Sequence, residues 1–363
     1  MTGSPSDMEH LSVAMTTETV GDVTQTTAVN AATSSSSRGM MFYFQCAAII
    51  IGFVGTAANA LILYCFVGSK QHTKHMLIFY QNVLDFFSSL IMAITYLLKL
   101  CNLHSTGLGE YLFCVLVDSE YLLWCIITAS KVNLMSLTIE RYLKVVYPIW
   151  SKKKLRNWVI YSVMAYALLF GFVHMSAATF PTSAVIDGVC YAYAFWESPY
   201  ARLAYGIFWI LFVYFFVFIL FVFCYWRILV VVRRQERVMA GYSAAGSNTT
   251  QSQSQLHHIQ TTNVIKTMIL VTAAFAVCDL PVTVYNIMGF AGMLSSQDAG
   301  YYISMFVSFL YICANPFIYA IKFDPVKRVL LSLIPCKNTP VQPIEAVEMA
   351  ARKSTKGTAQ PHK

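Results

Sequence analysis

Residues 203–226 read LAYGIFWILFVYFFVFILFVFCYW, and no charged side chain lies between Arg202 and Arg227. Roughly 20 such residues span the hydrocarbon core of a bilayer as a helix. The run is unbroken, whereas the strands of a membrane barrel alternate apolar and polar residues over about 10 positions. A helix also satisfies its own backbone hydrogen bonds, which lipid requires. This stretch therefore predicts a transmembrane helix.

Six further stretches of similar length carry at most one charged side chain each. They lie between Arg38 and Lys70, Lys74 and Lys99, Glu120 and Glu140, Arg156 and Asp187, Lys266 and Asp298, and Asp298 and Lys322. Hydrophobic residues make up 57% of the chain and charged residues 12%, against about 25% charged residues in a soluble domain. We therefore expect an all-α membrane protein, a bundle of seven transmembrane helices.

Lysine and arginine are concentrated on one side of this predicted bundle. The first, third and fifth connections and the C-terminal tail hold most of them, and the opposite side has only Arg38, Lys99 and Arg202. Because positively charged loops stay in the cytoplasm, we expect a multi-pass protein of the plasma membrane with its N-terminus outside. The net charge of +8 is then mostly a property of the inner face and does not indicate nucleic-acid binding.

The sequence divides into four parts. Residues 1–39, rich in Ser and Thr, are expected to be a disordered extracellular segment, and residues 40–322 the bundle. In residues 323–336, apolar side chains recur at helical spacing, which predicts a short amphipathic eighth helix on the cytoplasmic surface; they are Val326, Val329, Leu330 and Leu333. Cys336 at its end is a candidate for palmitoylation. Residues 337–363 are expected to be a disordered cytoplasmic tail.

Two cysteines, Cys114 and Cys190, fall on the outer, oxidising side. A disulfide between them is expected there, and two unpaired thiols are the alternative. Residues 184–193, AVIDGVCYAY, hold Asp-Gly between apolar residues, which is a hairpin signal. A short β-ribbon over the mouth of the bundle is therefore predicted.

The outer segments are acidic, with ten acids against three bases. The acids are Asp7, Glu9, Glu18, Asp22, Glu110, Asp118, Glu120, Asp187, Glu197 and Asp298. Such a field concentrates a cationic ligand. The alternative is that sorting of positive charge to the inside simply leaves acids outside.

Three charged residues lie inside the predicted helices. They are Asp85, Lys131 and Asp279, the last in residues 275–285, FAVCDLPVTVY. On insertion scales such a residue costs roughly 2.5–3.5 kcal/mol, so it usually has a partner or a function. Pro281, two residues after Asp279, removes a backbone hydrogen bond and lets its helix bend.

Four short motifs occur in a characteristic order. They are GTAANALIL at 55–63, NVLDFF at 82–87, SLTIERYLKVVYPI at 136–149 and ANPFIYAIKFDP at 314–325. Together they resemble the rhodopsin-like (class A) G-protein-coupled receptors over about residues 40–336. The resemblance implies a cell-surface receptor that passes the binding of an extracellular ligand to a heterotrimeric G protein.

Carried over residue by residue, the resemblance implies a G-protein switch at the inner ends of the helices. The matching residues are Glu140, Arg141, Tyr142, Tyr225, Asn315, Pro316 and Tyr319. Glu140 would hold Arg141 at rest, and Arg141 would meet the G protein in the active state. Arrestin and a receptor kinase are implied as further partners, and Pro281 is implied as the hinge of the sixth helix.

The resemblance also implies packing and cofactor roles. Asn59, Asp85 and Trp158 match residues that anchor the helices on one another. Asp85 and Ser130 match two members of a buried sodium site, so a structural Na⁺ is the cofactor that the resemblance implies, and no other is expected.

The chain departs from the family pattern in its core. Asp279 stands where the family usually has a tryptophan, and Lys131 stands where it usually has an aliphatic residue. In the family fold these positions lie close together, so we expect a buried ion pair between the two, with Asp85 either sharing the lysine or binding sodium. The alternative is a protonated Asp279 and a Lys131 that points at water. Cys114 also precedes Arg141 by two residues more than in the family, so a bulge or a longer helix top is needed.

Two ligand classes are excluded because the residues that would bind them are missing. Opsins need a lysine in the middle of the seventh helix, where this chain has Phe309, and amine receptors need an aspartate where it has Leu123. Candidate pocket residues are Tyr121, Trp124, Tyr285, Met288 and Tyr302, although aromatic stripes in helices are more often packing. The hairpin, the acidic rim and the ERY region look most like receptors of the galanin, somatostatin or allatostatin type, which favours a peptide ligand.

Two other functions stay open at this point: a chemosensory receptor for a small molecule, and a seven-helix protein that binds ligand without signalling. A transporter is disfavoured, because the sequence has no repeated halves. Enzymatic activity is not expected, since no catalytic or metal-spaced cluster is apparent.

Overall fold

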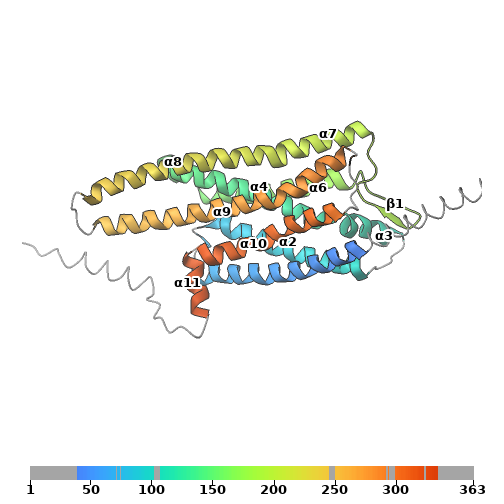
Figure 1. Cartoon of the computed structure of the whole chain (residues 1–363), viewed down its shortest axis with the longest axis horizontal. Helices are drawn as coiled ribbons and strands as arrows, with labels where there is room; N and C mark the ends of the chain where they lie inside the picture. Colours follow the sequence, from blue (N-terminus) through green and yellow to red (C-terminus); the bar gives the residue numbers. More distant parts are fainter. Residues whose placement is uncertain are drawn as a thin grey trace, which may run out of the picture.

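The computed structural model describes residues 39–70, 72–73, 75–101, 107–244, 250–291, 293, 299–322 and 324–333. The expectations for residues 1–38 and 334–363, including palmitoylation of Cys336, lie outside them. Within this part of the chain, seven helices are long and apolar enough to cross a membrane. The prediction of a seven-helix bundle is therefore confirmed (Figure 1).

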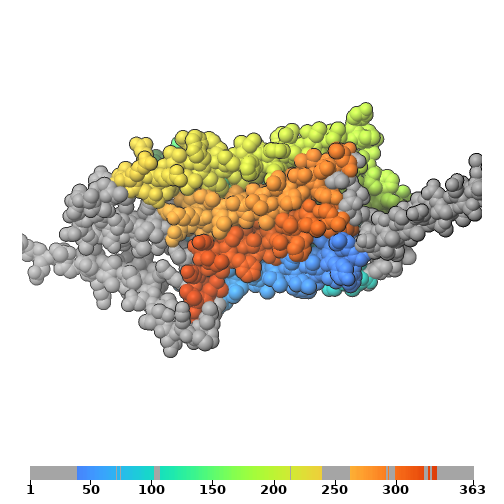
Figure 2. Space-filling model, in the orientation of Figure 1, coloured from blue at the N-terminus to red at the C-terminus, as the bar shows by residue number. Residues whose placement is uncertain are grey.

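The elements follow one another with short connections. They are the first helix, Gly39–Gly68, then α2 Met76–Cys101, α3 Leu108–Phe113, the π-helix η1 Cys114–Asp118, α4 Tyr121–Val146, α5 Pro148–Lys154, α6 Asn157–Thr179, β1 Ala184–Ile186, β2 Val189–Tyr191, α7 Pro199–Trp209, the π-helix η2 Ile210–Phe215, α8 Phe216–Ala244, α9 Thr250–Phe290, α10 Ala299–Lys322 and α11 Asp324–Leu333. Consecutive pieces form the third span, Leu108–Val146, and the fifth, Pro199–Val238. On the face seen in Figure 2, the first helix, α10, α9 and α8 lie side by side as adjacent bands.

The hairpin and α11 lie at opposite ends of the bundle (Figure 1), which are called here the hairpin end and the Arg141 end. β1 and β2 pair antiparallel, with Val185 opposite Cys190. Asp187 and Gly188 connect them with φ angles of 51° and 75°, the left-handed pair that a tight hairpin turn of the I′ type requires. The predicted ribbon is confirmed.

The disulfide between Cys114 and Cys190 is present, and it joins the hairpin to the start of η1. Between η1 and α4 the backbone turns irregularly, because Glu120 has a left-handed φ of 57°. A π-turn holds more residues per turn than an α-helix. The irregular top of the third span therefore takes up the two additional residues between Cys114 and Arg141.

Helix packing differs from one expectation. Trp158 is 62% exposed on α6, so its expected role as a packing anchor is wrong. Gly171 makes the close approach instead, because a Cβ there would lie 2.4 Å from the backbone oxygen of Cys125 in α4. Asn59 behaves as expected: its buried amide donates to Gly55 O and to Ile312 O of α10.

The short helix α11 lies across the Arg141 end of the bundle (Figure 1) and falls within the range expected for the eighth helix. Val326 is fully buried, and Val329 and Leu330 pack against the same core. These three residues of the predicted apolar stripe thus face the bundle.

Candidate functional site

Two of the three charged residues inside the helices, Lys131 and Asp279, form a buried ion pair. Lys131 Nζ on α4 donates hydrogen bonds to both carboxylate oxygens of Asp279 on α9, at 3.0 and 2.9 Å. Lys131 is 8% exposed and Asp279 5%. Ser308 Oγ on α10 donates to Asp279 as well, at 3.2 Å. The side chains therefore meet as expected, and Lys131 does not point at water.

Aromatic rings surround the ammonium group of this pair. Lys131 Nζ lies 5.6 Å from the ring centroid of Phe275 on α9 and 5.7 Å from that of Trp209 at the end of α7. Both distances are within the range of a cation–π interaction. The lysine therefore links α4 to α9 by charge and to the fifth span by its contact with the indole ring.

Asp85 on α2 has separate partners. Ser130 Oγ donates to Asp85 Oδ1 at 3.0 Å, and Asn315 Nδ2 on α10 donates to Asp85 Oδ2 at 2.7 Å. Gln81 Nε2 donates to Oδ1 at 3.1 Å and to Ser130 Oγ. Both hydrogen bonds of the Lys131 side chain to described residues go to Asp279, so the two acids do not share the lysine. Sequence reasoning missed Gln81, although a residue four positions before Asp85 lies on the same helix face.

A small cavity of about 10 Å³ separates the two acid clusters. It is lined by Ser88, Ile127, Ser130, Lys131, Asp279, Ser308, Tyr311 and Ile312. The hydroxyl of Tyr311 is buried and has no hydrogen-bond partner among the described residues. A space of this size with several polar walls has room for about one water molecule. Ser130 and Lys131, neighbours on α4, both line this cavity and each contacts one of the two acids directly.

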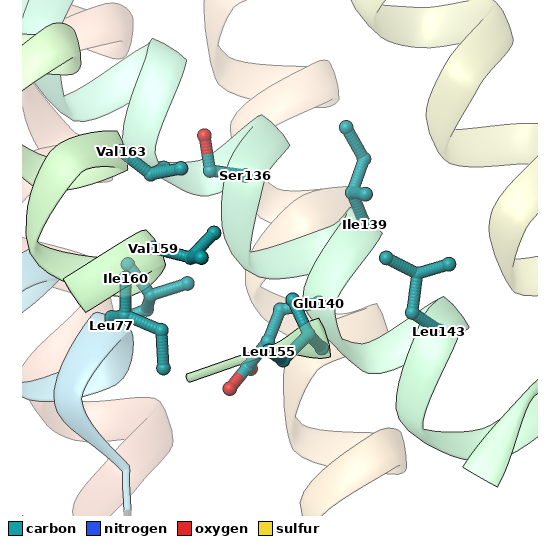
Figure 3. A pocket seen from close by; sticks show the side chains of 9 residues that line it. All are labelled: Leu77, Ser136, Ile139, Glu140, Leu143, Leu155, Val159, Ile160 and Val163. Carbon is teal, nitrogen blue, oxygen red and sulfur yellow. The ribbon is translucent and has the colours of Figure 1, made fainter. Parts of the chain in front are cut away.

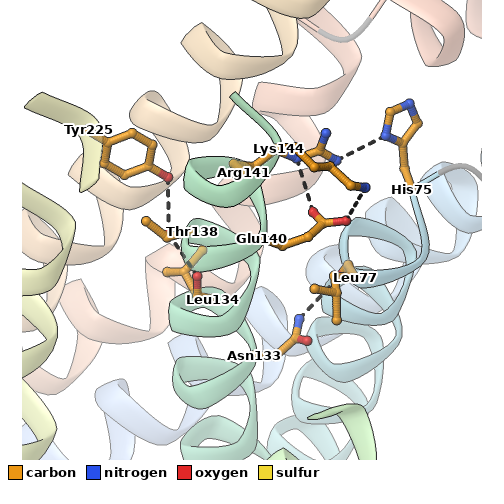
Figure 4. A network of polar contacts seen from close by, with 9 residues as sticks. All are labelled: His75, Leu77, Asn133, Leu134, Thr138, Glu140, Arg141, Lys144 and Tyr225. Atoms are coloured by element: carbon orange, nitrogen blue, oxygen red, sulfur yellow. Dashed lines mark hydrogen bonds and ion pairs between the residues drawn. The ribbon is translucent and has the colours of Figure 1, made fainter. Parts of the chain in front are cut away.

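Arg141 is held at the opposite end of α4 (Figure 4). Its Nε lies 3.4 Å from Glu140 Oε2, and its Nη2 donates to His75 Nδ1 at 3.0 Å. Glu140 also pairs with Lys144, one helical turn on. The expected contact between Glu140 and Arg141 is present. His75 and Lys144 were not expected, although a Glu and a Lys four residues apart on a helix are a recognisable pair.

Tyr225 on α8 connects two helices near Arg141. Its hydroxyl lies 3.2 Å from Thr138 Oγ1 on α4 (Figure 4) and 2.9 Å from Thr272 Oγ1 on α9. Tyr319 on α10 is fully buried, and among the described residues its hydroxyl has no hydrogen-bond partner. The two tyrosines therefore differ. The Tyr225 hydroxyl is hydrogen-bonded to α4 and α9, and the Tyr319 hydroxyl has no hydrogen-bond partner among the described residues.

The remaining switch residues have structural surroundings of their own. Pro281 lies inside α9 and Pro316 inside α10, so each helix lacks one internal backbone hydrogen bond at that point. The ring of Tyr142 packs against Tyr147 and Phe223, each at a centroid distance of 5.9 Å. Tyr142 therefore faces α8 and not the Glu140–Arg141 pair.

Three of the five candidate pocket residues, Trp124, Tyr285 and Tyr302, are joined by a series of contacting aromatic rings. The ring of Trp124 contacts Phe309, and Phe309 continues through Phe44 to Tyr302. Tyr285 contacts Tyr301, which contacts Tyr302. Met288 is half-buried. Trp124 and Tyr302 are thus packed through shared neighbours, which fits the packing interpretation of the aromatic stripe.

Tyr121 packs mainly toward α6, and Trp124 borders the same hydrophobic cluster. Its hydroxyl lies 2.7 Å from Ser176 Oγ on α6, and its ring packs against Phe172 and Phe180. It contacts α6 and the chain that follows it. We therefore place it in the α4–α6 interface.

An acidic residue at the hairpin end is neutralised internally. Glu120 Oε1 accepts hydrogen bonds from Lys99 Nζ and from the hydroxyl of Tyr96, both at 2.7 Å. Lys99 Nζ also donates to Asp118 O at 3.1 Å. Of the outer acids that the structure describes, Asp187 and Glu197 are exposed. This network was not anticipated, because its members come from two distant segments.

Tyr193 fastens the chain after the hairpin to the third span. Its hydroxyl donates to Ser119 O at 3.1 Å and lies 3.1 Å from Thr179 Oγ1. Burial raises the pKa of this phenol to about 12, so it stays a neutral donor over the physiological range. The segment is thereby held against both the top of the third span and α6.

A model of the family described as the 7 transmembrane receptor (rhodopsin family) matches residues 58–319. The chain belongs to this family. It is 24% identical to the melanopsin of Phodopus sungorus over 308 residues, covering 79% of this chain and 61% of the melanopsin, less than two thirds of that relative. The crystal structure of squid rhodopsin is similar with a TM-score of 0.67 and 15% identity, covering 89% of this chain and 93% of the other, which supports the fold alone.

The donors around Asp85 do not fit the sodium ion that this family implies. A hard cation takes oxygen ligands. Of the three described groups that contact the carboxylate, Gln81 and Asn315 present nitrogen donors, and Ser130 alone presents an oxygen. An N–H group carries a partial positive charge, which opposes a cation at the same place.

This receptor also has a cleft at the Arg141 end, between α2, α4 and α6 (Figure 3). Its volume is about 120 Å³, and apart from Ser136 and Glu140 its lining is apolar. Figure 3 shows Glu140 and Leu155 near one end and Ser136 and Val163 near the other. Glu140, the residue that holds Arg141, therefore also lines this cleft.

Proposed function

We propose that this receptor couples the binding of an extracellular ligand at the hairpin end to activation of a heterotrimeric G protein at the Arg141 end. The contact between Arg141 and Glu140, at 3.4 Å, carries this proposal. This contact keeps Arg141 paired with a residue of its own helix. In that state Arg141 is not free to meet the G protein. Engagement of Tyr225 with Thr138 and Thr272 supports the same resting state.

The proposed orientation follows from charge. Lys144, Lys152, Lys153 and Lys154 all lie at or beyond the Arg141 end of α4, in α4 and α5. Positively charged segments remain on the cytoplasmic side. We accordingly place the Arg141 end in the cytoplasm, the hairpin outside the cell, and the receptor in the plasma membrane.

The mechanism is a shift between two states. Ligand binding displaces α9 relative to α4, with Pro281 as the hinge, and so changes the Lys131–Asp279 contact that joins these two helices. At the Arg141 end the same motion separates Tyr225 from Thr272, because their hydrogen bond joins α8 to α9. Arg141 then leaves Glu140 and meets the G protein.

A peptide is the ligand class that we favour. The exposed Asp187 at the hairpin turn and Glu197 beyond it give this end a negative rim that suits a cationic ligand. Aromatic side chains fill the interior below: Phe309 is 1% exposed and Trp124 packs against it. A ligand that acts from the rim is therefore favoured over one that enters deeply. A small-molecule chemosensory ligand is the second candidate.

The coupling is tested by ligand-free G-protein activation in cells that express matched amounts of the wild type, Glu140→Gln and Arg141→Ala. Removing the carboxylate charge releases Arg141, and a change of about 1–2 kcal/mol in the two-state equilibrium raises basal activity by about 5–30-fold. Arg141→Ala abolishes the signal. Tyr200→Phe, at the opposite end, alters a side chain that is 83% exposed; it is the control and leaves the ligand-free signal unchanged.

If the signals of all variants equal that of cells without receptor, the proposal fails. The ligand class needs a separate screen in the Glu140→Gln background, with a library of cationic peptides and a library of small apolar molecules. Activation by peptides that is weakened by Asp187→Asn supports the peptide ligand. Activation by small molecules alone establishes the chemosensory alternative.

A further inference from the structure

The side-chain nitrogen of Gln81 contacts both oxygen atoms that would bind the implied cation, Asp85 Oδ1 and Ser130 Oγ. Its Nε2 lies 3.1 Å from Asp85 Oδ1 and also donates to Ser130 Oγ. Gln81 and Asp85 are completely buried, and Ser130 is 5% exposed. A cation that bridged Asp85 and Ser130 would have to stand where this nitrogen stands.

The orientation of the Gln81 amide is fixed by its neighbours. Asn133 on α4 donates to the backbone oxygen of Leu77 at 3.2 Å, and a carbonyl oxygen only accepts, so the Asn133 atom there is Nδ2. The same Nδ2 lies 2.9 Å from the other amide atom of Gln81. That atom must therefore be the oxygen, Oε1. It follows that the group facing Asp85 is the NH₂ group.

We infer that the side-chain amide of Gln81 takes the place of a sodium ion between Asp85 and Ser130, so that the resting receptor is independent of sodium. Asp85 then receives uncharged donors from three helices: Gln81 on α2, Ser130 on α4 and Asn315 on α10. Gln81 is thus a positioning residue, which holds the carboxylate and the hydroxyl together without an ion.

The chain Leu77–Asn133–Gln81 makes this replacement rigid. Each hydrogen bond in this chain restricts the orientation of the next side chain. The side chains of Asn133, Gln81 and Asp85 are all completely buried. Turning the amide to present its oxygen to a cation would bring Nε2 against Asn133 Nδ2, two donors facing each other. Such a buried mismatch opposes the flip, and so the site rejects the ion.

The test is the thermal unfolding of the purified full-length receptor in detergent, in sodium chloride and in potassium chloride at equal ionic strength. The wild type is expected to unfold at the same temperature in both salts. A higher unfolding temperature in sodium, lost in Asp85→Asn, would overturn the inference. This measurement needs no G protein, so its result is independent of the proposed signalling function.

Gln81→Leu removes the amide and leaves the carboxylate and hydroxyl facing an apolar gap. Sodium is expected to raise the unfolding temperature of this variant by about 2–4 °C over potassium, the shift given by a ligand at about five times its Kd. Gln81→Met, which keeps the length of the side chain, serves if the leucine variant does not fold. Asn82→Leu is the matched control, because Asn82 is buried on α2 and donates to Ile78 O. Absence of a sodium effect in both Gln81 variants would also overturn the inference.

Discussion

Lys131 and Asp279 form a buried bidentate contact, in which one ammonium group donates at 3.0 and 2.9 Å to the two oxygens of one carboxylate. The pair joins α4 to α9 in the middle of the bundle. Desolvation costs several kcal/mol for each ion, so each charge is tolerated there because of the other. The contact also lies about midway between the hairpin end and Arg141, on the helix that carries Pro281.

This compensation predicts non-additive effects on stability. Lys131→Met or Asp279→Asn alone leaves one buried charge without its partner, at a cost of about 3–5 kcal/mol in the free energy of unfolding. The double variant leaves neither charge and is expected to recover a large part of that loss. Thermal unfolding of the purified proteins measures all three. Lys153→Met, which removes an exposed lysine of α5, is the control and is expected to change stability by less than about 0.5 kcal/mol. A double variant no more stable than the worse single variant would refute the pairing.

The Lys131–Asp279 pair shows which features of the structure can be predicted from the sequence and which cannot. Unbroken apolar runs and the placement of lysine and arginine predict seven helices, and the Asp187-Gly188 dipeptide predicts the hairpin, because these signals are local. The pairing of Lys131 with Asp279 was predicted from two matched departures that fall on neighbouring positions of a known fold. Its detailed surroundings, such as Trp209 above the ammonium group, depend on the rotation of the helices.

Other features escaped prediction for physical reasons. The role of Gln81 depends on a chain of buried amides from two helices, and a glutamine has no distinctive pattern in an apolar run. The Lys99–Glu120 pair depends on the left-handed turn at Glu120, which follows a π-helix that periodicity does not predict. The predicted packing role of Trp158 was wrong, because a tryptophan in a helix suits a packing position and a lipid-facing one equally well.

The disulfide is expected to be a major support of the hairpin end. Cys114 and Cys190 are 76 residues apart, and closing a loop of that length stabilises the fold by about 4 kcal/mol in the chain-entropy treatment. Cys114→Ser, Cys190→Ser and the double variant are expected to lower the unfolding temperature equally. Cys101→Ser, which alters an exposed free cysteine, is the control. Full stability of the double variant would show that the contacts of Tyr193 hold this end without the covalent bond.

Close packing of α4 on α6 makes Gly171 sensitive to a single methyl group. A Cβ at this position would lie 2.4 Å from Cys125 O and 3.1 Å from Ala129 N, both backbone atoms that cannot rotate away. Gly171→Ala is therefore expected to destabilise the receptor by about 1–3 kcal/mol, despite the higher helix propensity of alanine. Gly68→Ala, where no atom lies within 4 Å, is the matched control and is expected to leave stability unchanged or slightly raised. Comparable unfolding temperatures for the two variants would mean that the helices separate at little cost.

Similarity to melanopsin raises the question of an aldehyde ligand, and the structure predicts that retinal forms no pigment with this receptor. Phe309 stands at the position of the opsin lysine and is 1% exposed, packed against Trp124 and Phe44. Lys131, the buried lysine nearby, donates to Asp279 and adjoins a cavity of about 10 Å³, room for a single water molecule. A Schiff base needs an amine that is free of other partners and space for the whole ligand, and this lysine has neither.

Absorption spectra after incubation with retinal, with an opsin treated identically as the positive control, test this prediction. No visible band is expected for the wild type, and none after acid denaturation, which would trap any protonated Schiff base. A pigment that appears in the wild type and disappears in Lys131→Met would show that Lys131 binds the aldehyde. In that case Asp279, the acceptor of both Lys131 hydrogen bonds, would be the group that balances the charge of the protonated imine.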